Sequence, residues 1–197
     1  MAWDFDGVLN RGFLGGFFLW QESFATDLGV SAEVFTEFVF KTPRFAEVLT
    51  GQRDLMDLLA EWVLAHDVPQ APEFVLDYWL AKDANADPQV LDWLAACPLP
   101  GVIATNNERH RADFIWHQMG FSRRMQAIFA SGPMGVKKPD AGFFARIEAW
   151  SGLPPSDILL VDDSEKNITA ATALGWQVFH FTDDTRGALP EVLGVKP

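Results

Sequence analysis

The sequence has little of what marks secreted or nucleic-acid-binding proteins. Cys97 is the single cysteine among 197 residues, so no disulfide can form within the chain, and we expect a protein of the reducing cytoplasm. Basic residues are scarce, because 15 Lys and Arg face 27 Asp and Glu and give a formal net charge of −12. Binding DNA or RNA requires a basic patch that displaces counterions from phosphates. We therefore expect no nucleic-acid partner.

Long apolar runs are also missing. The most apolar stretch, Gly12–Trp20, is too short and too rich in glycine to span a bilayer. The N-terminus has no basic segment followed by an apolar run, so we expect neither a secretory signal nor a membrane partner. Hydrophobic residues make up 49% of the chain and charged residues 21%, which is typical of a globular protein. A monomer and a homodimer both stay open.

The C-terminal half alternates short apolar runs with amphipathic segments, which predicts strands alternating with helices. The expected strands are 2–5, 101–105, 127–130, 157–161 and 177–181, and the expected helices of this half are 108–119, 141–150 and 164–174. Such alternation is typical of βαβ units. We predict an α/β fold with a Rossmann-like parallel sheet that carries helices on both faces.

The region after the first strand shows only helical patterns. The expected helices are 17–28, 31–40, 43–49, 53–65 and 72–82. The simplest arrangement is an all-helical insert between the first and second strands of one domain. We predict a core of residues 1–16 and 86–197 and a helical insert of residues 17–85. Gly12, Gly15 and Gly16 would form the outgoing hinge and residues 83–88 the return linker.

Polar clusters directly follow three apolar runs. Asp4 and Asp6 follow the first, residues 105–107 (Thr-Asn-Asn) end the second, and Asp162 and Asp163 follow the run that ends at residue 161. Taken singly, each cluster is an ordinary turn or helix cap. Together they lie at the carboxyl ends of parallel strands, which share one edge of the sheet, where ligands bind. We therefore expect them to converge.

Four converging carboxylates cannot all ionise unless cations neutralise them or their pKa values rise. Oxygen ligands of this kind suit a hard cation that keeps water in its shell, and Mg²⁺ is the natural choice. Lys138, within residues 135–139 (Gly-Val-Lys-Lys-Pro), offers a fixed positive charge. One divalent ion and one lysine roughly balance the acids and leave an electropositive hole for a phosphate.

These motifs resemble those of a known superfamily. Asp4-Phe-Asp-Gly-Val-Leu, Thr105-Asn, Lys138-Pro-Asp and residues 161–167 (Val-Asp-Asp-Ser-Glu-Lys-Asn) are similar, in identity and order, to the four motifs of the haloacid dehalogenase (HAD) superfamily of hydrolases. The helical insert lies where that superfamily carries its small α-helical, C1-type cap. Residues 102–182 resemble the branch that contains sugar-phosphate phosphatases and the N-terminal phosphatase domain of soluble epoxide hydrolases. The resemblance implies a HAD-like fold and leaves the substrate open.

The resemblance also implies a role for each matching residue. Asp4 would be the nucleophile that forms an aspartyl-phosphate, and Asp6 the acid that protonates the leaving oxygen and then the base that activates water. Thr105 and the amide of Asn106 would hold phosphate oxygens. Lys138 would stabilise the nucleophile and the transferring phosphoryl group. The implied activity is magnesium-dependent hydrolysis of a small phosphorylated metabolite, such as a sugar phosphate.

The same resemblance implies a ligand set for the magnesium ion. It comprises the Asp4 carboxylate, the main-chain carbonyl of Asp6 and the Asp163 carboxylate, with Asp162 beside them or one layer further out. Asn167 lies one helical turn beyond Asp163, where relatives often place another polar residue around the metal.

Asp6 favours phosphoryl transfer over a haloacid dehalogenase, because halide leaves without a proton. A phosphomutase keeps this acid and stays open, as does a catalytically silent binding protein, because only three residues precede Asp4 on its strand. A phosphorylatable domain of receiver type also combines acids, a threonine and a lysine. Its acidic pair, however, follows the first strand, whereas Asp162 and Asp163 come late here.

Specificity is expected in the helical insert and in the loop after Asp6, which is rich in Phe, Leu and Trp between residues 13 and 20. Aromatic residues at helical spacing more often pack in a core than contact a substrate. Lys41 and Arg44 are the basic residues of the insert that would contact an anionic substrate, although solvated surface charge is the more ordinary role.

Overall fold

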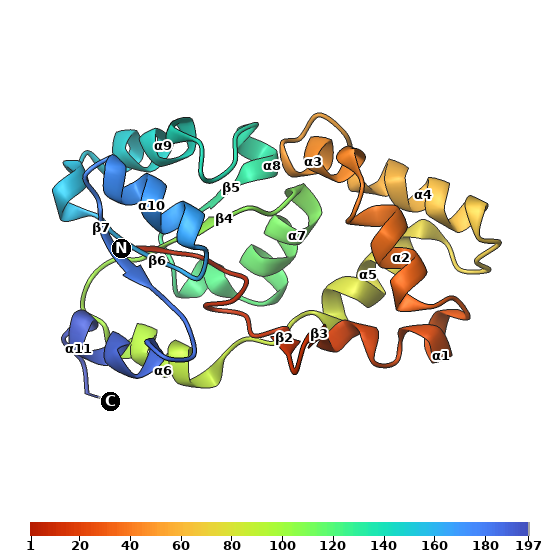
Figure 1. Ribbon diagram of the computed structural model, residues 1–197, viewed down its shortest axis with the longest axis horizontal. Coiled ribbons are helices and arrows are strands. Elements are labelled where there is room, and N and C mark those ends of the chain that lie inside the picture. The colour runs from red at the N-terminus through yellow and green to blue at the C-terminus, as the bar shows by residue number, and fades with distance from the viewer. Residues whose placement is uncertain (197) are drawn as a thin grey trace.

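The computed structural model describes residues 1–196 and places a parallel five-stranded sheet at the centre of the core (Figure 1). The strands are β1 (Ala2–Trp3), β4 (Val102–Thr105), β5 (Ala127–Ala130), β6 (Leu159–Asp162) and β7 (Gln177–His180). Their order in the sheet is β5-β4-β1-β6-β7, and every neighbouring pair is parallel. The predicted α/β fold with a Rossmann-like parallel sheet is confirmed.

Strand β1 is central although it is short. Ala2 and Trp3 are fully buried and pair with both β4 and β6. The predicted strand 2–5 ends earlier, at Trp3, because the chain turns away after Asp4. Main-chain pairing nevertheless continues past the strand, since the N–H of Asp4 donates to the carbonyl of Val161 at 2.8 Å. A neighbouring strand therefore fixes the backbone of Asp4.

Helices cover both faces of the sheet, because successive side chains of a strand point to opposite sides. On one face, Trp3 and Ile103 pack with residues of α6 (Pro88–Ala96), η2 (Phe114–Gln118) and α11 (Leu189–Leu193). On the other face, Ala2 and Leu160 pack with residues of α9 (Ala141–Ser151) and α10 (Glu165–Ala173). Figure 1 shows α9 and α10 on one side of the sheet and α6 and α11 on the other.

Two further predicted elements of the core differ in the structure, and one helix of the core was not predicted. The expected helix 108–119 is α7 (Arg109–Asp113) followed by the π-helical turn η2, and it begins after Glu108, whose carboxylate accepts the N–H groups of His110 and Arg111. The expected strand 157–161 begins at Leu159, because a 3₁₀ turn, η4 (Pro155–Asp157), precedes it. Helix α6 was not predicted at all.

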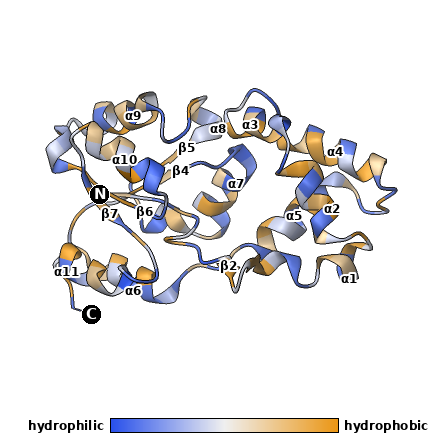
Figure 2. Cartoon of the chain, viewed as in Figure 1, coloured by the Kyte–Doolittle hydropathy of each residue, from blue (hydrophilic) through white to orange (hydrophobic). Residues whose placement is uncertain are grey.

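The helical insert packs around its own buried cluster, which contains Phe24, Phe35 and Trp62. Its helices are η1 (Leu19–Gln21), α1 (Phe24–Leu28), α2 (Ala32–Val39), α3 (Pro43–Leu49), α4 (Leu55–Ala65) and α5 (Pro72–Lys82). Local sequence sets several starts: Ser31 and Asp54 accept hydrogen bonds at the starts of α2 and α4, and prolines open α3 and α5. Figure 2 shows hydrophobic and hydrophilic residues on the same helices, as expected for helices that bury one face.

The segment 13–18 is a β-hairpin, so the predicted helix 17–28 is wrong in its first turns. Strand β2 (Phe13–Leu14) pairs antiparallel with β3 (Phe17–Phe18). Gly15 and Gly16 form the turn with φ values of 63° and 90°. Two consecutive positive φ angles suit a tight hairpin turn that only glycine adopts without strain. These glycines therefore reverse the chain within the hairpin.

The outgoing and returning connections of the insert run side by side. The side chain of Asn10 donates to the carbonyl of Asp83 at 2.9 Å and accepts the N–H of Asn85 at 2.7 Å. The main chain of Arg11 donates to the carbonyl of Asn85 at 2.8 Å. We call these paired connections, residues 9–11 and 83–87, the neck. Among the helices of residues 1–196, none has the length and apolar character needed to cross a membrane.

Candidate active site

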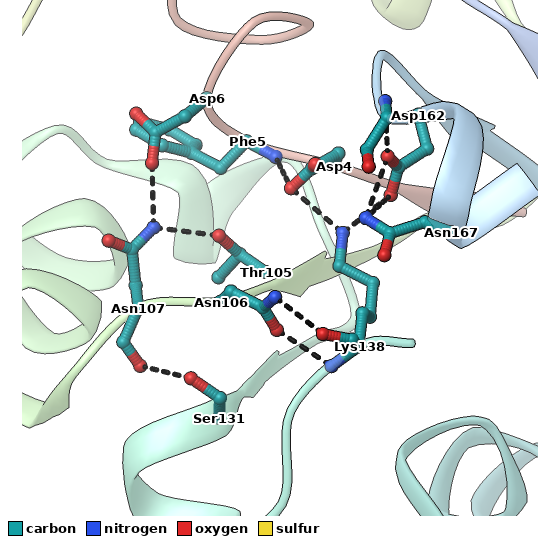
Figure 3. A network of polar contacts seen from close by, with 11 residues as sticks. Asp4, Phe5, Asp6, Thr105, Asn106, Asn107, Ser131, Lys138, Asp162 and Asn167 are labelled. Atoms are coloured by element: carbon teal, nitrogen blue, oxygen red, sulfur yellow. Dashed lines mark hydrogen bonds and ion pairs between the residues drawn. The ribbon is translucent and has the colours of Figure 1, made fainter. Parts of the chain in front are cut away.

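Polar side chains gather at the carboxyl ends of β1, β4 and β6. Asp4 follows β1, Thr105 ends β4 and Asp162 ends β6. Lys138 enters from the loop between α8 (Ser131–Met134) and α9. Figure 3 shows its ammonium group between the carboxylates of Asp4 and Asp162. The structure thus brings together residues from four separate segments of the chain.

Lys138 is the fixed positive charge of this cluster. Its Nζ lies 2.6 Å from Oδ2 of Asp162 and 3.0 Å from Oδ1 of Asp4, in a fully buried position. Burial alone lowers the pKa of the ammonium group, but the two carboxylates outweigh burial and raise that pKa above its ordinary value. Asn106 fixes the lysine backbone, because its side chain accepts the N–H of Lys138 at 2.8 Å and donates to its carbonyl at 2.9 Å.

Asp4 and Asp163 carry more negative charge than their surroundings neutralise. Burial raises the pKa of Asp4 well above its ordinary value, with Lys138 opposing this effect and Asp162 adding to it. Partial desolvation and the neighbouring Asp162 also raise the pKa of Asp163, although the residue keeps contact with solvent. One carboxylate oxygen from each of Asp4, Asp162 and Asp163 lies within 4.8 Å of the other two. Such a set of hard oxygen donors fits Mg²⁺, whose charge would favour the ionised carboxylates.

The two aspartates after β6 are held differently. Asp162 is fully buried, and its Oδ1 accepts hydrogen bonds from the side chain of Asn167 and the N–H of Ser164, both at 2.9 Å, while its Oδ2 contacts Lys138. Asp163 is exposed and points toward the loop after Asp4. Asp163 therefore has the freer carboxylate for a metal, and Asp162 orients the lysine.

Gly7 brings the loop after Asp4 against Asp163. Its φ is +82°, and a Cβ at this position would overlap the Asp163 carboxylate. Glycine is required here both for the backbone conformation and for the close approach. Position 7 of the predicted motif therefore accepts only glycine.

Asp6 lies at the edge of the cluster and is held by two residues that sequence analysis gave no role. Its Oδ1 accepts a hydrogen bond from Arg111 at 2.6 Å, and its Oδ2 accepts one from Asn107 at 2.9 Å. The same amide of Asn107 donates to Oγ1 of Thr105 at 2.7 Å, as Figure 3 shows. The Asp6 side chain stays 49% exposed. Asn107 therefore joins the predicted acid–base residue to the predicted phosphate-binding threonine.

Arg111 connects the site to the neck and to the insert. Its guanidinium pairs with Asp83 as well as Asp6 and lies 5.2 Å from the ring centroid of Trp79 on α5. Burial opposes its charge, but the two carboxylates raise its pKa above the ordinary value. Burial raises the pKa of Asp83 to about 6, although Arg111 acts in the opposite direction. Arg111 lies on α7, and no pattern in the sequence distinguishes it from the other basic residues of that helix.

A cavity of about 420 Å³ opens beside Asp6, between the hairpin, the insert and the start of α7. Lys41, one of the two basic residues predicted to contact substrate, lines this cavity and pairs with Glu37 at 2.6 Å. Arg44, the other, is outside the lining and pairs with Glu61 at 2.8 Å. The structure thus brings only Lys41 to the cavity.

A parallel sheet with this cluster at one edge, and an insert between its first two strands in the sequence, defines a class of α/β hydrolases. The family model described as haloacid dehalogenase-like hydrolase matches residues 1–175. The chain belongs to this family of HAD-like hydrolases, as its motifs predicted.

Solved structures share the fold. A predicted HAD-like hydrolase of Porphyromonas gingivalis superposes with a TM-score of 0.76 at 19% identity, covering 99% of this chain and 97% of the other. A HAD family enzyme of Bacteroides thetaiotaomicron, in complex with magnesium and inorganic phosphate, gives 0.74 at 16% identity over 92% of each chain. The L-2-haloacid dehalogenase of Xanthobacter autotrophicus gives 0.68 at 17% identity, covering all of this chain and 82% of the other.

A curated relative matches only part of the chain. Drimenol cyclase drtB of Aspergillus calidoustus is 36% identical over 69 residues, which are 34% of this chain and 13% of that protein. Most of that relative's length therefore has no counterpart here.

Proposed function

We propose that this hydrolase is a magnesium-dependent phosphatase that cleaves a small phosphate monoester through an aspartyl-phosphate on Asp4. The observation that supports this proposal is the placement of Asp6. Its half-exposed carboxylate lines the cavity and is oriented by Arg111 and Asn107. Departure of an alkoxide requires such an acid, whereas departure of a halide does not.

The chain's own residues supply both steps of the reaction. An Asp4 oxygen attacks phosphorus, the bond from phosphorus to the ester oxygen breaks, and that oxygen takes a proton from Asp6. The Asp6 carboxylate, now anionic and stabilised by Arg111, takes a proton from the water that attacks the phosphoryl group. Asp4 is then released with inorganic phosphate.

Two further residues stabilise charge in this mechanism. Lys138 favours the anionic form of the Asp4 carboxylate against the burial that raises its pKa, because the ammonium group lies 3.0 Å from Oδ1. The Thr105 hydroxyl accepts from Asn107 and retains its own proton to donate to a phosphate oxygen. A magnesium ion held by Asp4, Asp163 and the main-chain carbonyl of Asp6, with Asp162 adjacent, would neutralise phosphate oxygens.

We also propose that the helical insert, residues 17–85, acts as a cap over a core of residues 1–16 and 86–197. Its separate buried cluster supports this division, as does a cavity lined from both sides. The expected cytoplasmic location, the monomeric or homodimeric state and the absence of nucleic-acid and membrane partners stay predictions.

Phosphate release from p-nitrophenyl phosphate and a panel of phosphorylated metabolites tests the proposal. We expect turnover that needs Mg²⁺, stops with a chelator and falls at least ~10⁴-fold in Asp4→Asn, since the nucleophile is lost. Asp92→Asn, an aspartate on α6 outside the site, serves as the matched control and keeps wild-type turnover. Full activity in Asp4→Asn would refute the mechanism.

The haloacid dehalogenase is the second candidate, favoured by the fold shared with the Xanthobacter enzyme. Halide release from 2-chloropropionate separates the two reactions. Asp6→Asn adds a second distinction, because it should abolish phosphatase turnover and spare a dehalogenase. Halide release that survives Asp6→Asn, without phosphate release from any ester, would establish the second candidate instead.

A further inference from the structure

We infer that the alcohol part of the substrate is apolar, so that the enzyme cleaves the phosphate monoester of an aliphatic or aromatic alcohol in preference to a sugar phosphate. This inference rests on the proposed phosphatase function and concerns the cavity beside Asp6. Two observations support it: the cavity wall is mainly apolar, and most polar groups of the wall already have hydrogen-bond or ion-pair partners.

Apolar surface forms most of the cavity wall. Six aromatic residues contribute to it: Phe13, Phe18, Trp20, Phe40, Phe45 and Trp79. The hairpin rings of Phe13 and Phe18 pack edge to face with centroids 4.9 Å apart, yet remain 54% and 44% exposed. Large exposed apolar side chains beside a reactive centre are stabilised when an apolar ligand covers them. The hairpin thus presents a surface that suits a hydrocarbon chain or ring.

Both cations of the lining are already paired. Arg111 is buried and bound to Asp6 and Asp83. Lys41 is bound to Glu37 at 2.6 Å. A second anionic group on the substrate, such as a carboxylate or another phosphate, would have to share the exposed Lys41 with Glu37 or displace a carboxylate from Arg111.

The neutral polar groups of the lining are engaged as well. The amides of Asn10, Asn106 and Asn107 bond to the neck, to the Lys138 backbone and to Asp6 and Thr105, respectively. The Thr36 hydroxyl accepts from Gln21 at 3.3 Å and retains one proton to donate.

These engaged groups leave little for a sugar to bind. Trp79 Nε1 has no partner among the described residues but is itself buried, and the Thr36 hydroxyl adds one proton. A sugar brings several hydroxyls, and each one buried without a partner costs binding free energy. We therefore expect the cavity to bind a sugar more weakly than an apolar group of similar size.

Turnover of matched esters with Mg²⁺ tests the inference. The panel is methyl, butyl and octyl phosphate, 1-naphthyl phosphate and glucose 6-phosphate, compared by kcat/KM. We expect kcat/KM to rise about threefold per added methylene until the cavity is filled, as burial of each group predicts. Octyl phosphate should exceed glucose 6-phosphate by at least about 100-fold. Equal or better turnover of glucose 6-phosphate would overturn the inference and leave the phosphatase proposal intact.

Binding without turnover separates the inference from the proposed function. Octylphosphonate and methylphosphonate, which cannot be hydrolysed at the ester position, are titrated into the Mg²⁺-loaded protein by calorimetry. Tighter binding of octylphosphonate by about 100-fold supports the apolar cavity even if every ester in the panel is inert, which would refute the phosphatase. Equal binding of both phosphonates overturns the inference.

Two substitutions of similar exposure supply the structural control. Phe13→Ala removes a ring from the cavity, whereas Phe74→Ala removes a 52% exposed ring of α5 outside the lining. We expect Phe13→Ala to lower the ratio of kcat/KM for octyl over methyl phosphate by about tenfold, and Phe74→Ala to leave this ratio unchanged. An unchanged ratio in Phe13→Ala would contradict the assignment of the hairpin to the substrate.

Discussion

Replacement of Lys138 by methionine should leave the negative charge of Asp4 and Asp162 without its buried positive partner. The lysine is buried, with Nζ 2.6 Å from Asp162 and 3.0 Å from Asp4. Removing one partner of a buried ion pair leaves an uncompensated charge and typically costs about 3–5 kcal/mol. For a chain of this length, that loss corresponds to a fall in Tm of about 6–20 °C. Phosphatase turnover should be lost with it, because the charge that favours the anionic form of Asp4 would be gone.

The pH dependence of this loss distinguishes electrostatics from packing. Without the ammonium group, the pKa of the buried Asp4, which burial already raises above the unfolded value, rises further, so Asp4 stays protonated in the folded state. Below the unfolded pKa, both states are protonated and the variant regains stability. As pH rises through about 4, only the unfolded state releases its protons, so the folded variant loses stability.

Urea unfolding at pH 4.5 and pH 7.5 measures both effects. We expect the stability difference between wild type and Lys138→Met to grow between the two pH values and to shrink on addition of Mg²⁺, which binds the folded carboxylates. Lys137→Met, a neighbouring lysine outside the cluster, serves as the control and should stay near wild type. A difference of the same size at both pH values would show that packing, not charge, explains the loss.

Three further predictions concern single residues around the site. Gly7→Ala should destabilise the fold by more than ~1 kcal/mol and reduce turnover, because the new Cβ would overlap the Asp163 carboxylate and the backbone φ is +82°. Urea unfolding and phosphate release measure the two effects, and wild-type values in both would contradict the close approach. Asn107→Ala should lower kcat about 100-fold with little change in KM, since Asp6 loses the amide that orients it; a change in KM alone would assign Asn107 to binding instead. The pKa of Asp83 is about 6 in the folded protein against an ordinary 3.8. Between about pH 4 and pH 6 only the unfolded state releases this proton, so the free energy of unfolding should fall by about 3 kcal/mol as pH rises through this window. Asp83→Asn should flatten the stability profile across this window, and an unchanged slope would show that Asp83 is ionised in the fold throughout.

The sheet and the convergence at its edge were predictable because they depend on local patterns. Apolar runs alternating with amphipathic segments require parallel strands, and the carboxyl ends of such strands meet at one edge. Asp4, Lys138 and Asp162 were therefore expected near each other, and the structure places them within ion-pair distance.

The elements that sequence analysis missed depend on finer signals. Phe17 and Phe18 carry the apolar character of a helix but follow two glycines, and the turn chemistry of those glycines outweighs the helical pattern. Helix α6 begins at Pro88, which was interpreted as part of a linker, although Asp87 before it accepts hydrogen bonds at its start. A proline after an acidic residue marks a helix start as readily as a turn.

The partners of Asp6 were missed for a different reason. Arg111 pairs with Asp6 from a distance of 105 residues in the sequence, and with Asp83 in the returning connection. No local pattern indicates which of the basic residues on a helix will be buried against a loop this distant. Only the path of the insert back to the core determines that pairing.

Because the two connections of the neck lie side by side, the insert could be exchanged or deleted by protein engineering. Asn10 and Arg11 bond to the segment around Asn85, so the chain leaves and re-enters the core at nearly the same point. A short turn joining these two points would close the core without stretching its backbone, and loops of very different length cost similar closure entropy. An insert from another family member could replace this one in the same way, changing the surface above Asp6 while the sheet edge beneath it stays as it is.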